Sequence, residues 1–170
     1  MKMDEATWAR HANPLSVWTR FTCLPLLVVA IWSREWIGNW SLIAIGAALI
    51  WIWVNPRVFP EPADFDHWPG KATFGERVWL NRLEIPIPPH HERAVFLISL
   101  LIIPGIVLTG YGLFTLQVWP TILGSALAMM AKAWFCDRMV WLYEDMRVKN
   151  AIYASWMRRP VNDNSSRRAA

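Results

Sequence analysis

Apolar residues are concentrated in long runs along this chain. Residues 36–54 and 94–131 are almost free of charged side chains, and a shorter apolar run covers residues 15–32. One helical crossing of a bilayer needs roughly 20 apolar residues, so the longest run is sufficient for two crossings. The pattern predicts four membrane-spanning helices, at about residues 15–32, 36–54, 94–113 and 118–136.

Short polar turns separate the spans within each predicted pair. Residues 33–35 and 110–119 read as tight hairpins on one side of the membrane, so both termini and the loop 55–93 fall on the other side. Among the 17 Lys and Arg residues, Arg34 alone belongs to the hairpin side. The positive-inside rule therefore predicts that both termini are cytoplasmic. Membrane topology and anionic lipid headgroups account for the net charge of +4, so we expect no nucleic-acid partner.

Two Asn-Pro pairs mark expected helix boundaries. Asn13 is a good N-cap, and Pro14 suits the first helical position because its missing N–H would have no partner there. Asn55 precedes Pro56, and the residue before a proline is disfavoured in helical conformation, which predicts that the second span ends there. Pro25 lies inside the first span and frees a backbone carbonyl that a neighbour must satisfy.

The central loop, residues 55–93, carries seven of the 12 prolines and should be extended and stiff. Thr73 and Glu76 have the spacing of a capping box. This predicts a short amphipathic helix that starts near Thr73, includes Arg77 and Arg82, and lies on the membrane interface.

The fourth predicted helix should extend beyond the membrane. Charged residues follow residue 136, and Asp145 and Lys149 have the i, i+4 spacing of a helical ion pair. Gly124 and Ala128 are small residues that favour close helix packing. Residues 1–157 then form one membrane domain, and the basic tail 158–170 is expected to be disordered.

The 13 tryptophans support the membrane interpretation. Trp is favoured at the membrane interface because its ring is apolar and its N–H needs a polar partner. A soluble helical bundle with a Trp-rich core is the alternative, but such long uncharged runs exceed typical globular helices. A cleaved signal peptide is a second alternative for residues 15–32, and we disfavour it because no small-residue cleavage motif follows.

Histidines and acids gather at the predicted cytoplasmic ends of the spans. His and carboxylate groups suit zinc or iron, and the same groups serve acid–base catalysis. A metal is therefore a possible cofactor, with His11, His90 and His91 as candidate ligands. The alternative is that these groups are solvated side chains at the level of the lipid headgroups. The candidate catalytic residues are His11, His90, His91, Asp137 and Glu144.

Arginines near the same face form a second candidate site. The planar guanidinium pairs well with phosphate and carboxylate, so a basic pocket for an anionic headgroup is one interpretation. The other is that Arg20, the deepest charge, extends to the interface, as Lys132 could. The candidate ligand-binding residues are Arg20, Arg57, Arg77 and Arg82.

Several function classes are disfavoured. The predicted spans contain no Asp, Glu or His, which argues against proton-coupled transport through a buried carboxylate and against an axial-histidine haem inside the membrane. The sequence has no P-loop, Rossmann or nucleophile-elbow glycine pattern. Whether the protein is an enzyme stays open, since no motif determines a reaction.

Several blocks of the sequence resemble a family of small prokaryotic multi-span membrane proteins with no assigned function. The resemblance covers about residues 5–157 and implies a prokaryotic inner membrane, but no activity. The blocks are HANPLSVWTRF (11–21), NPRVFPEP (55–62), GERVWLNR (75–82), IPPHH (87–91) and DRMVWLYEDM (137–146).

The sequence thus predicts an all-α, four-helix transmembrane bundle of the inner membrane with cytoplasmic termini. The expected partners are the lipid bilayer and either another membrane protein or further copies of the chain. Two hypotheses of function follow. In the first, a cytoplasm-facing His, carboxylate and Arg site binds a metal or an anionic, lipid-like ligand. In the second, the protein is a non-catalytic accessory subunit that packs against a larger membrane complex.

Overall fold

The computed structural model describes residues 4–157, and within this range all regular structure is helical. The long helices are α5, α7 and α8, and a 3-10 turn, η1, precedes α5. The helix bounds are α1 Glu5–His11, α2 Pro14–Phe21, α3 Cys23–Trp32, α4 Arg34–Ile37, η1 Gly38–Trp40, α5 Ser41–Val58, α6 Trp68–Leu80, α7 Pro89–Thr115, α8 Val118–Lys149 and α9 Ala151–Ser155. The predicted tail 158–170 lies outside the described residues.

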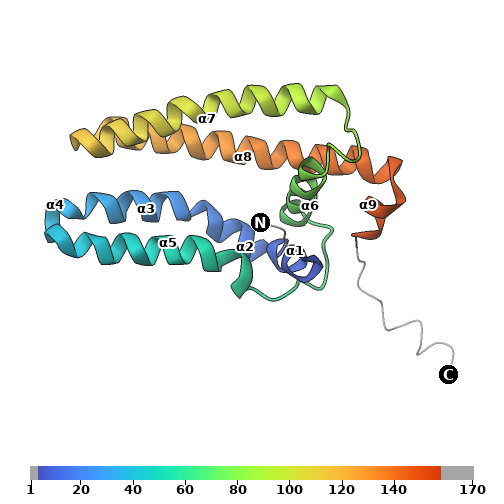
Figure 1. Ribbon diagram of the computed structural model, residues 1–170, viewed down its shortest axis with the longest axis horizontal. Coiled ribbons are helices and arrows are strands. Elements are labelled where there is room, and N and C mark those ends of the chain that lie inside the picture. Colours follow the sequence, from blue (N-terminus) through green and yellow to red (C-terminus); the bar gives the residue numbers. More distant parts are fainter. Residues whose placement is uncertain (1–3, 158–170) are drawn as a thin grey trace.

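Two antiparallel helical hairpins run side by side (Figure 1). The first consists of α3 and α5, and the second of α7 and α8. Their turns, at α4 and between α7 and α8, lie at the same end of the molecule, in the arrangement that the sequence predicts. Helices α1, α6 and α9 gather at the opposite end, where α6 crosses between the hairpins. We call this opposite end the polar end, because the ion pairs described below lie there.

Small residues bring α7 and α8 into close contact. A Cβ added at Gly124 would lie 2.4 Å from the backbone nitrogen of Thr109, and one added at Gly105 would lie 2.8 Å from that of Ala128. Such distances leave no room for larger side chains. Gly124 and Ala128 therefore serve internal packing of the hairpin, as predicted from their spacing.

The first predicted span is interrupted near its start. The expected cap is confirmed, since the Asn13 side chain accepts a hydrogen bond of 2.8 Å from the Leu15 N–H and Pro14 opens α2. The helix then breaks at Thr22, between α2 and α3. Pro25 explains the break, because it has no N–H to bond the carbonyl four residues earlier.

The second predicted span has different ends in the structure. Helix α5 begins at Ser41, because Gly38 turns the chain with a φ of 54°. It continues to Val58 with Pro56 inside it, so the prediction that Asn55 ends the helix is wrong. Asn55 is fully buried instead, and its side-chain nitrogen donates a hydrogen bond of 2.7 Å to the Thr19 hydroxyl. This tertiary contact outweighs the local preference of a residue before proline.

Helix α6 was predicted too short and in the wrong environment. It starts at Trp68, where the His67 side chain accepts a 2.9 Å hydrogen bond from the Gly70 N–H. Thr73 and Glu76 therefore lie inside the helix, and the predicted capping box is wrong. Over half of α6 is buried against the rest of the protein, so it is not a helix that rests on a surface.

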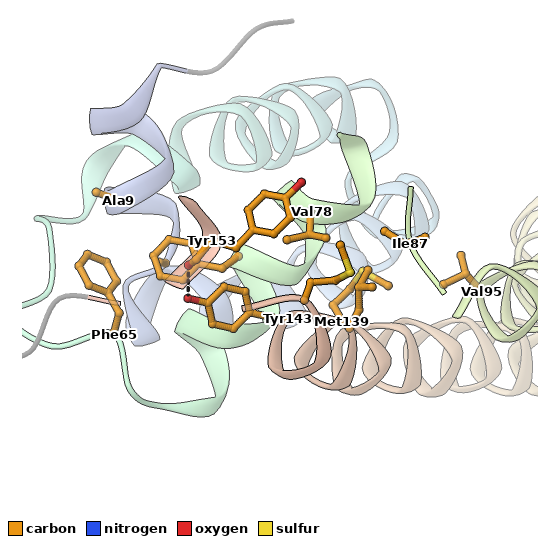
Figure 2. Close-up of a cluster of buried hydrophobic side chains, with 12 residues drawn as sticks. Ala9, Phe65, Val78, Ile87, Val95, Met139, Tyr143 and Tyr153 are labelled. Carbon is orange, nitrogen blue, oxygen red and sulfur yellow. Dashed lines mark hydrogen bonds between the residues drawn. The ribbon is translucent and has the colours of Figure 1, made fainter. Parts of the chain in front are cut away.

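The main apolar core lies at the polar end of the molecule, between α1, α6, the second half of α8 and α9 (Figure 2). Phe65, Phe74, Met139 and Tyr153 are among its buried members. The Tyr143 hydroxyl is buried there and donates a 2.9 Å hydrogen bond to the Tyr153 carbonyl oxygen, drawn as a dashed line in Figure 2. Burial raises the pKa of Tyr143 to about 12, so the phenol keeps its proton at neutral pH.

Tyr143→Phe is expected to lower the free energy of unfolding by about 1 kcal/mol, because the buried Tyr153 carbonyl loses its side-chain donor. Thermal melting of the detergent-purified protein would measure the change. Tyr111→Phe is the matched control, since Tyr111 is exposed on α7. Equal melting temperatures for the two variants would contradict the expectation.

Away from this core, the long helices expose their apolar side chains. Two helical segments of the described chain, Pro14–Val58 and Pro89–Thr115, are long and apolar enough to cross a membrane. In the most apolar stretch of the first segment, only 11% of the residues are buried inside the protein. In the most apolar stretch of the second segment, the share is 22%. A core helix of a soluble protein would be mostly covered by its neighbours. The fourth predicted span, in α8, is less apolar than these two segments, since it contains Lys132 and several small residues.

Candidate functional site

His11 and Arg20 form the centre of a polar cluster where α1 meets α2. The Arg20 guanidinium contacts the His11 ring, and its Nη2 donates a 3.2 Å hydrogen bond to the His11 carbonyl oxygen. Arg20 Nε donates a second bond, of 3.1 Å, to the Ser16 carbonyl oxygen. Only Ala12 and Asn13 separate the two helices, which keeps Arg20, in the last turn of α2, within reach of His11 at the end of α1.

Helices α6 and α8 complete this cluster with one carboxylate and one amine. Glu76 Oε1 lies 3.2 Å from Lys132 Nζ, and Glu76 Oε2 lies 3.9 Å from His11 Nε2. The side chain of Glu76 is 27% exposed and that of Lys132 is 50% exposed. We refer to His11, Arg20, Glu76 and Lys132 as the basic cluster.

The cluster carries an unbalanced positive charge at neutral pH. Burial lowers the pKa of His11; Glu76 opposes this effect and the Arg20 charge adds to it. The ring is therefore neutral and accepts a hydrogen bond from Arg20. Burial alone would raise the pKa of Glu76, but the contact with His11 and the charges of Lys132 and Arg20 outweigh it and hold this pKa at about 2. Two cations thus share a single carboxylate.

A cavity of about 180 Å³ opens beside the basic cluster. Arg20, Glu76 and Lys132 form its polar rim, and most of its wall is apolar. The apolar wall is built from α2, α3, α6 and α8. Its apolar residues are Val17, Phe21, Leu24, Ala72, Ala128, Met129 and Met139. A site of this kind suits a ligand with an anionic group at one end of an apolar body.

His90 and His91 form a separate group with Asp145. His91 Nε2 lies 2.8 Å from Asp145 Oδ2, and His90 Nε2 lies 3.6 Å from the same oxygen. His91 is 1% exposed, whereas the side chain of His90 is 59% exposed. The first turn of α7 places both rings beside the last turns of α8. The predicted pair of Asp145 with Lys149 is not among the ion pairs of the described residues, because Asp145 faces the histidines.

The two predicted acids of α8 have other partners. Asp137 Oδ1 accepts a 3.2 Å hydrogen bond from the Trp68 indole N–H. Glu144 pairs with Lys71 at 2.8 Å, and with Arg147 on its own helix. Both acids connect α8 to its surroundings, and the structure brings neither of them to the histidines that the sequence grouped with them.

Of the four predicted arginines, Arg20 alone reaches the cavity. Arg57 stacks on Trp53, with 4.6 Å from its guanidinium carbon to the ring centre, and Arg82 stacks on Trp79 at 4.2 Å. Arg77 lies 4.0 Å from the ring centre of Trp156 and pairs with Glu5. Aromatic rings hold Arg57 and Arg82 near their own helices, whereas Arg77 reaches residues of two other segments, so the structure does not bring the four predicted arginines together.

Three residues of the basic cluster and of the histidine group were not among the candidate site residues from the sequence. They are Glu76, Lys132 and Asp145. Glu76 was interpreted as part of a capping box and Asp145 as a partner of Lys149. Lys132 carried a signal, since a lysine inside a predicted span needs either water or a partner. The partner, Glu76, is 56 residues away in the sequence.

The chain belongs to DUF6653, a family of unknown function, which matches residues 1–160. This agrees with the predicted resemblance to a family without an assigned activity. No curated protein matches the chain, and no solved structure matches it.

Proposed function

We propose that this member of DUF6653 is a multi-span protein of the prokaryotic inner membrane that binds an anionic amphiphile, such as a phospholipid, in the cavity beside the basic cluster. The observation that carries the proposal is the composition of that cavity. Its wall is apolar, and its rim holds two cations that share one carboxylate.

The exposed apolar faces of the long helices support the membrane part of the proposal. Leu42, Ile50, Val107 and Leu123, on α5, α7 and α8, are each more than 60% exposed. In water this surface would carry a large cost, whereas lipid tails cover it without one. The hairpin turns then lie on the outer side, and the polar end, with the basic cluster, faces the cytoplasm according to the positive-inside rule.

The position of the cavity supports a lipid-like ligand. Arg20 and Lys132 each lie within a predicted span, close to its cytoplasmic end, which is the level of the lipid phosphates. A second apolar cavity, of about 220 Å³, lies between α3 and α8 near the hairpin turns. Val29, Trp32 and Ile122 are among its lining residues. An acyl chain that starts at the basic cluster can thus follow the contact between the hairpins.

The charge balance determines which headgroups fit. A headgroup with a net negative charge neutralises the extra cation, whereas a zwitterionic headgroup brings a positive charge of its own. Both headgroups offer a phosphate, so the difference between them is repulsion of the second one's cation, which for unit charges about 6 Å apart near a protein surface is about 2 to 3 kcal/mol and corresponds to at least a tenfold difference in affinity. We therefore expect a preference for phosphatidylglycerol over phosphatidylcholine.

Lys132→Gln tests this function. The delipidated protein in mild detergent is titrated with phosphatidylglycerol and with phosphatidylcholine, and bound lipid is counted by native mass spectrometry. The wild type is expected to bind about one phosphatidylglycerol at least tenfold more tightly than phosphatidylcholine. The variant should lose most of this preference, because Lys132 is half exposed and supplies charge without supporting the core.

Lys149→Gln is the matched control, since Lys149 is an exposed lysine of the same helix, about two dozen ångströms along α8 from Lys132 at about 1.5 Å per residue. It should bind both lipids as the wild type does. Equal affinity for the two lipids in the wild type, or an unchanged preference in Lys132→Gln, would refute the proposed function.

A further inference from the structure

We propose that His90, His91 and Asp145 form a binding site for a divalent transition-metal ion such as Zn²⁺, which would link the start of α7 to the end of α8. The site lies apart from the basic cluster. Asp145 follows Lys132 on α8 by roughly 20 Å, at about 1.5 Å per residue. The inference therefore does not depend on the proposed lipid binding.

The donor atoms are already close together. One nitrogen from each histidine and one oxygen of Asp145 all lie within 4.8 Å of one another. Ligands of a tetrahedral zinc ion, with Zn–N near 2.0 Å, are separated by about 3.4 Å. The observed 3.6 Å from His90 Nε2 to Asp145 Oδ2 is near that value, and the 2.8 Å from His91 Nε2 to the same oxygen would have to lengthen towards it.

The three ligands differ in how firmly they are held. His91 is buried and fixed between the two helices, so it provides a rigid ligand that loses little entropy on binding. The side chains of His90 and Asp145 are 59% and 47% exposed, which lets them adjust and leaves the remaining coordination positions open to water. Two imidazoles and a single carboxylate form a donor set that favours zinc and similar first-row metals over Mg²⁺ or Ca²⁺.

A purely structural interpretation makes a different prediction. If the group only fastens α7 to α8, the 2.8 Å contact between His91 and Asp145 is sufficient. His90, whose ring is tilted against that of His91 with ring centres 4.2 Å apart, would then be dispensable. The metal interpretation requires His90, because it supplies the third ligand.

The decisive experiment compares zinc binding by the wild type and by His90→Ala. Full-length protein without a polyhistidine tag is purified in mild detergent, stripped with a chelator, and titrated with Zn²⁺ in competition with a chromophoric chelator. The wild type is expected to bind one Zn²⁺ per chain at this site. His90→Ala should weaken the binding by at least tenfold, and Asp145→Asn should do the same.

Thermal melting gives a second readout that does not require an activity. Zn²⁺ should raise the melting temperature of the wild type, because it joins two helices only in the folded state, and should leave that of His90→Ala unchanged. His90 is exposed, so its replacement is expected to leave the metal-free melting temperature nearly unaltered.

Two control variants complete the test. Glu92→Gln changes an exposed carboxylate in the same turn of α7 and should retain zinc binding. Lys132→Gln should also retain it, so loss of lipid preference and loss of metal binding are distinguishable. Equal zinc affinity in the wild type and His90→Ala would overturn the proposal, as would the absence of a stoichiometric zinc ion in the wild type.

Discussion

Gly75→Ala is expected to cause the largest loss of stability among single substitutions considered for this protein. A Cβ added at Gly75 would lie 1.9 Å from the carbonyl oxygen of Met139 and 2.5 Å from its carbonyl carbon. These are backbone atoms of α8, so no side-chain rotation relieves the clash. Helices α6 and α8 would have to separate, and Met139, now fully buried, would lose its packing.

The expected cost is about 3 kcal/mol or more, at the upper end of what overpacking costs in a core. Thermal melting and the yield of folded protein in detergent measure it. Because α6 supplies Glu76 to the cavity, phosphatidylglycerol binding should fall as well. Gly46→Ala is the control, since a Cβ there meets nothing within 4 Å. Equal melting temperatures for Gly75→Ala and Gly46→Ala would refute the close contact between α6 and α8.

Glu76→Gln is expected to remove a pH-dependent part of the stability. The pKa of Glu76 is about 2 in the folded protein, compared with 4.5 in its ordinary state. A carboxyl whose pKa is depressed by folding stabilises the folded state above the unfolded pKa, and this contribution is lost as the pH falls through the folded pKa. The contribution of the Glu76 carboxylate to the free energy of unfolding is therefore complete above pH 4.5 and disappears towards pH 2. It amounts to about 3 kcal/mol at most.

The variant should therefore be less stable than the wild type at pH 7, because Arg20 and Lys132 lose their shared carboxylate. The difference between the two proteins should shrink as the pH falls from 4.5 to 2. Melting temperatures at several pH values in this window measure it. Glu84→Gln is the control, since Glu84 is exposed. A difference that stays constant with pH would contradict the assigned role of Glu76.

The candidate site could be predicted from the sequence only in part. The sequence selected His11 and Arg20, and these two residues are in contact because they are nine positions apart across a short loop. It also selected His90 and His91 as neighbours in one helical turn. The sequence analysis placed His11 in the same candidate site as His90 and His91. In the structure His11 faces Arg20 instead, and His91 faces Asp145. Hydrophobic patterns show which end of a span a residue occupies, but not its rotation about the helix axis.

Local conformational preferences were also reliable only where nothing competed with them. Asn13 and Pro14 begin a helix as predicted, because capping depends on adjacent residues alone. Pro56 was expected to end α5, but the hydrogen bond between Asn55 and Thr19 lets the helix continue to Val58. The capping box at Thr73 failed in a similar way, since His67 caps α6 further upstream.

The sequence by itself determined the helical character of the chain, its long apolar segments and the pairing of those segments into hairpins with turns at one end. These features follow from the length of apolar runs and from short turns, which are local properties. The tertiary structure decided that Glu76 of α6 meets Lys132 of α8, and that Asp145 meets His91 rather than Lys149. Such contacts join residues more than fifty positions apart, and they depend on how α6 and α7 pack against α8.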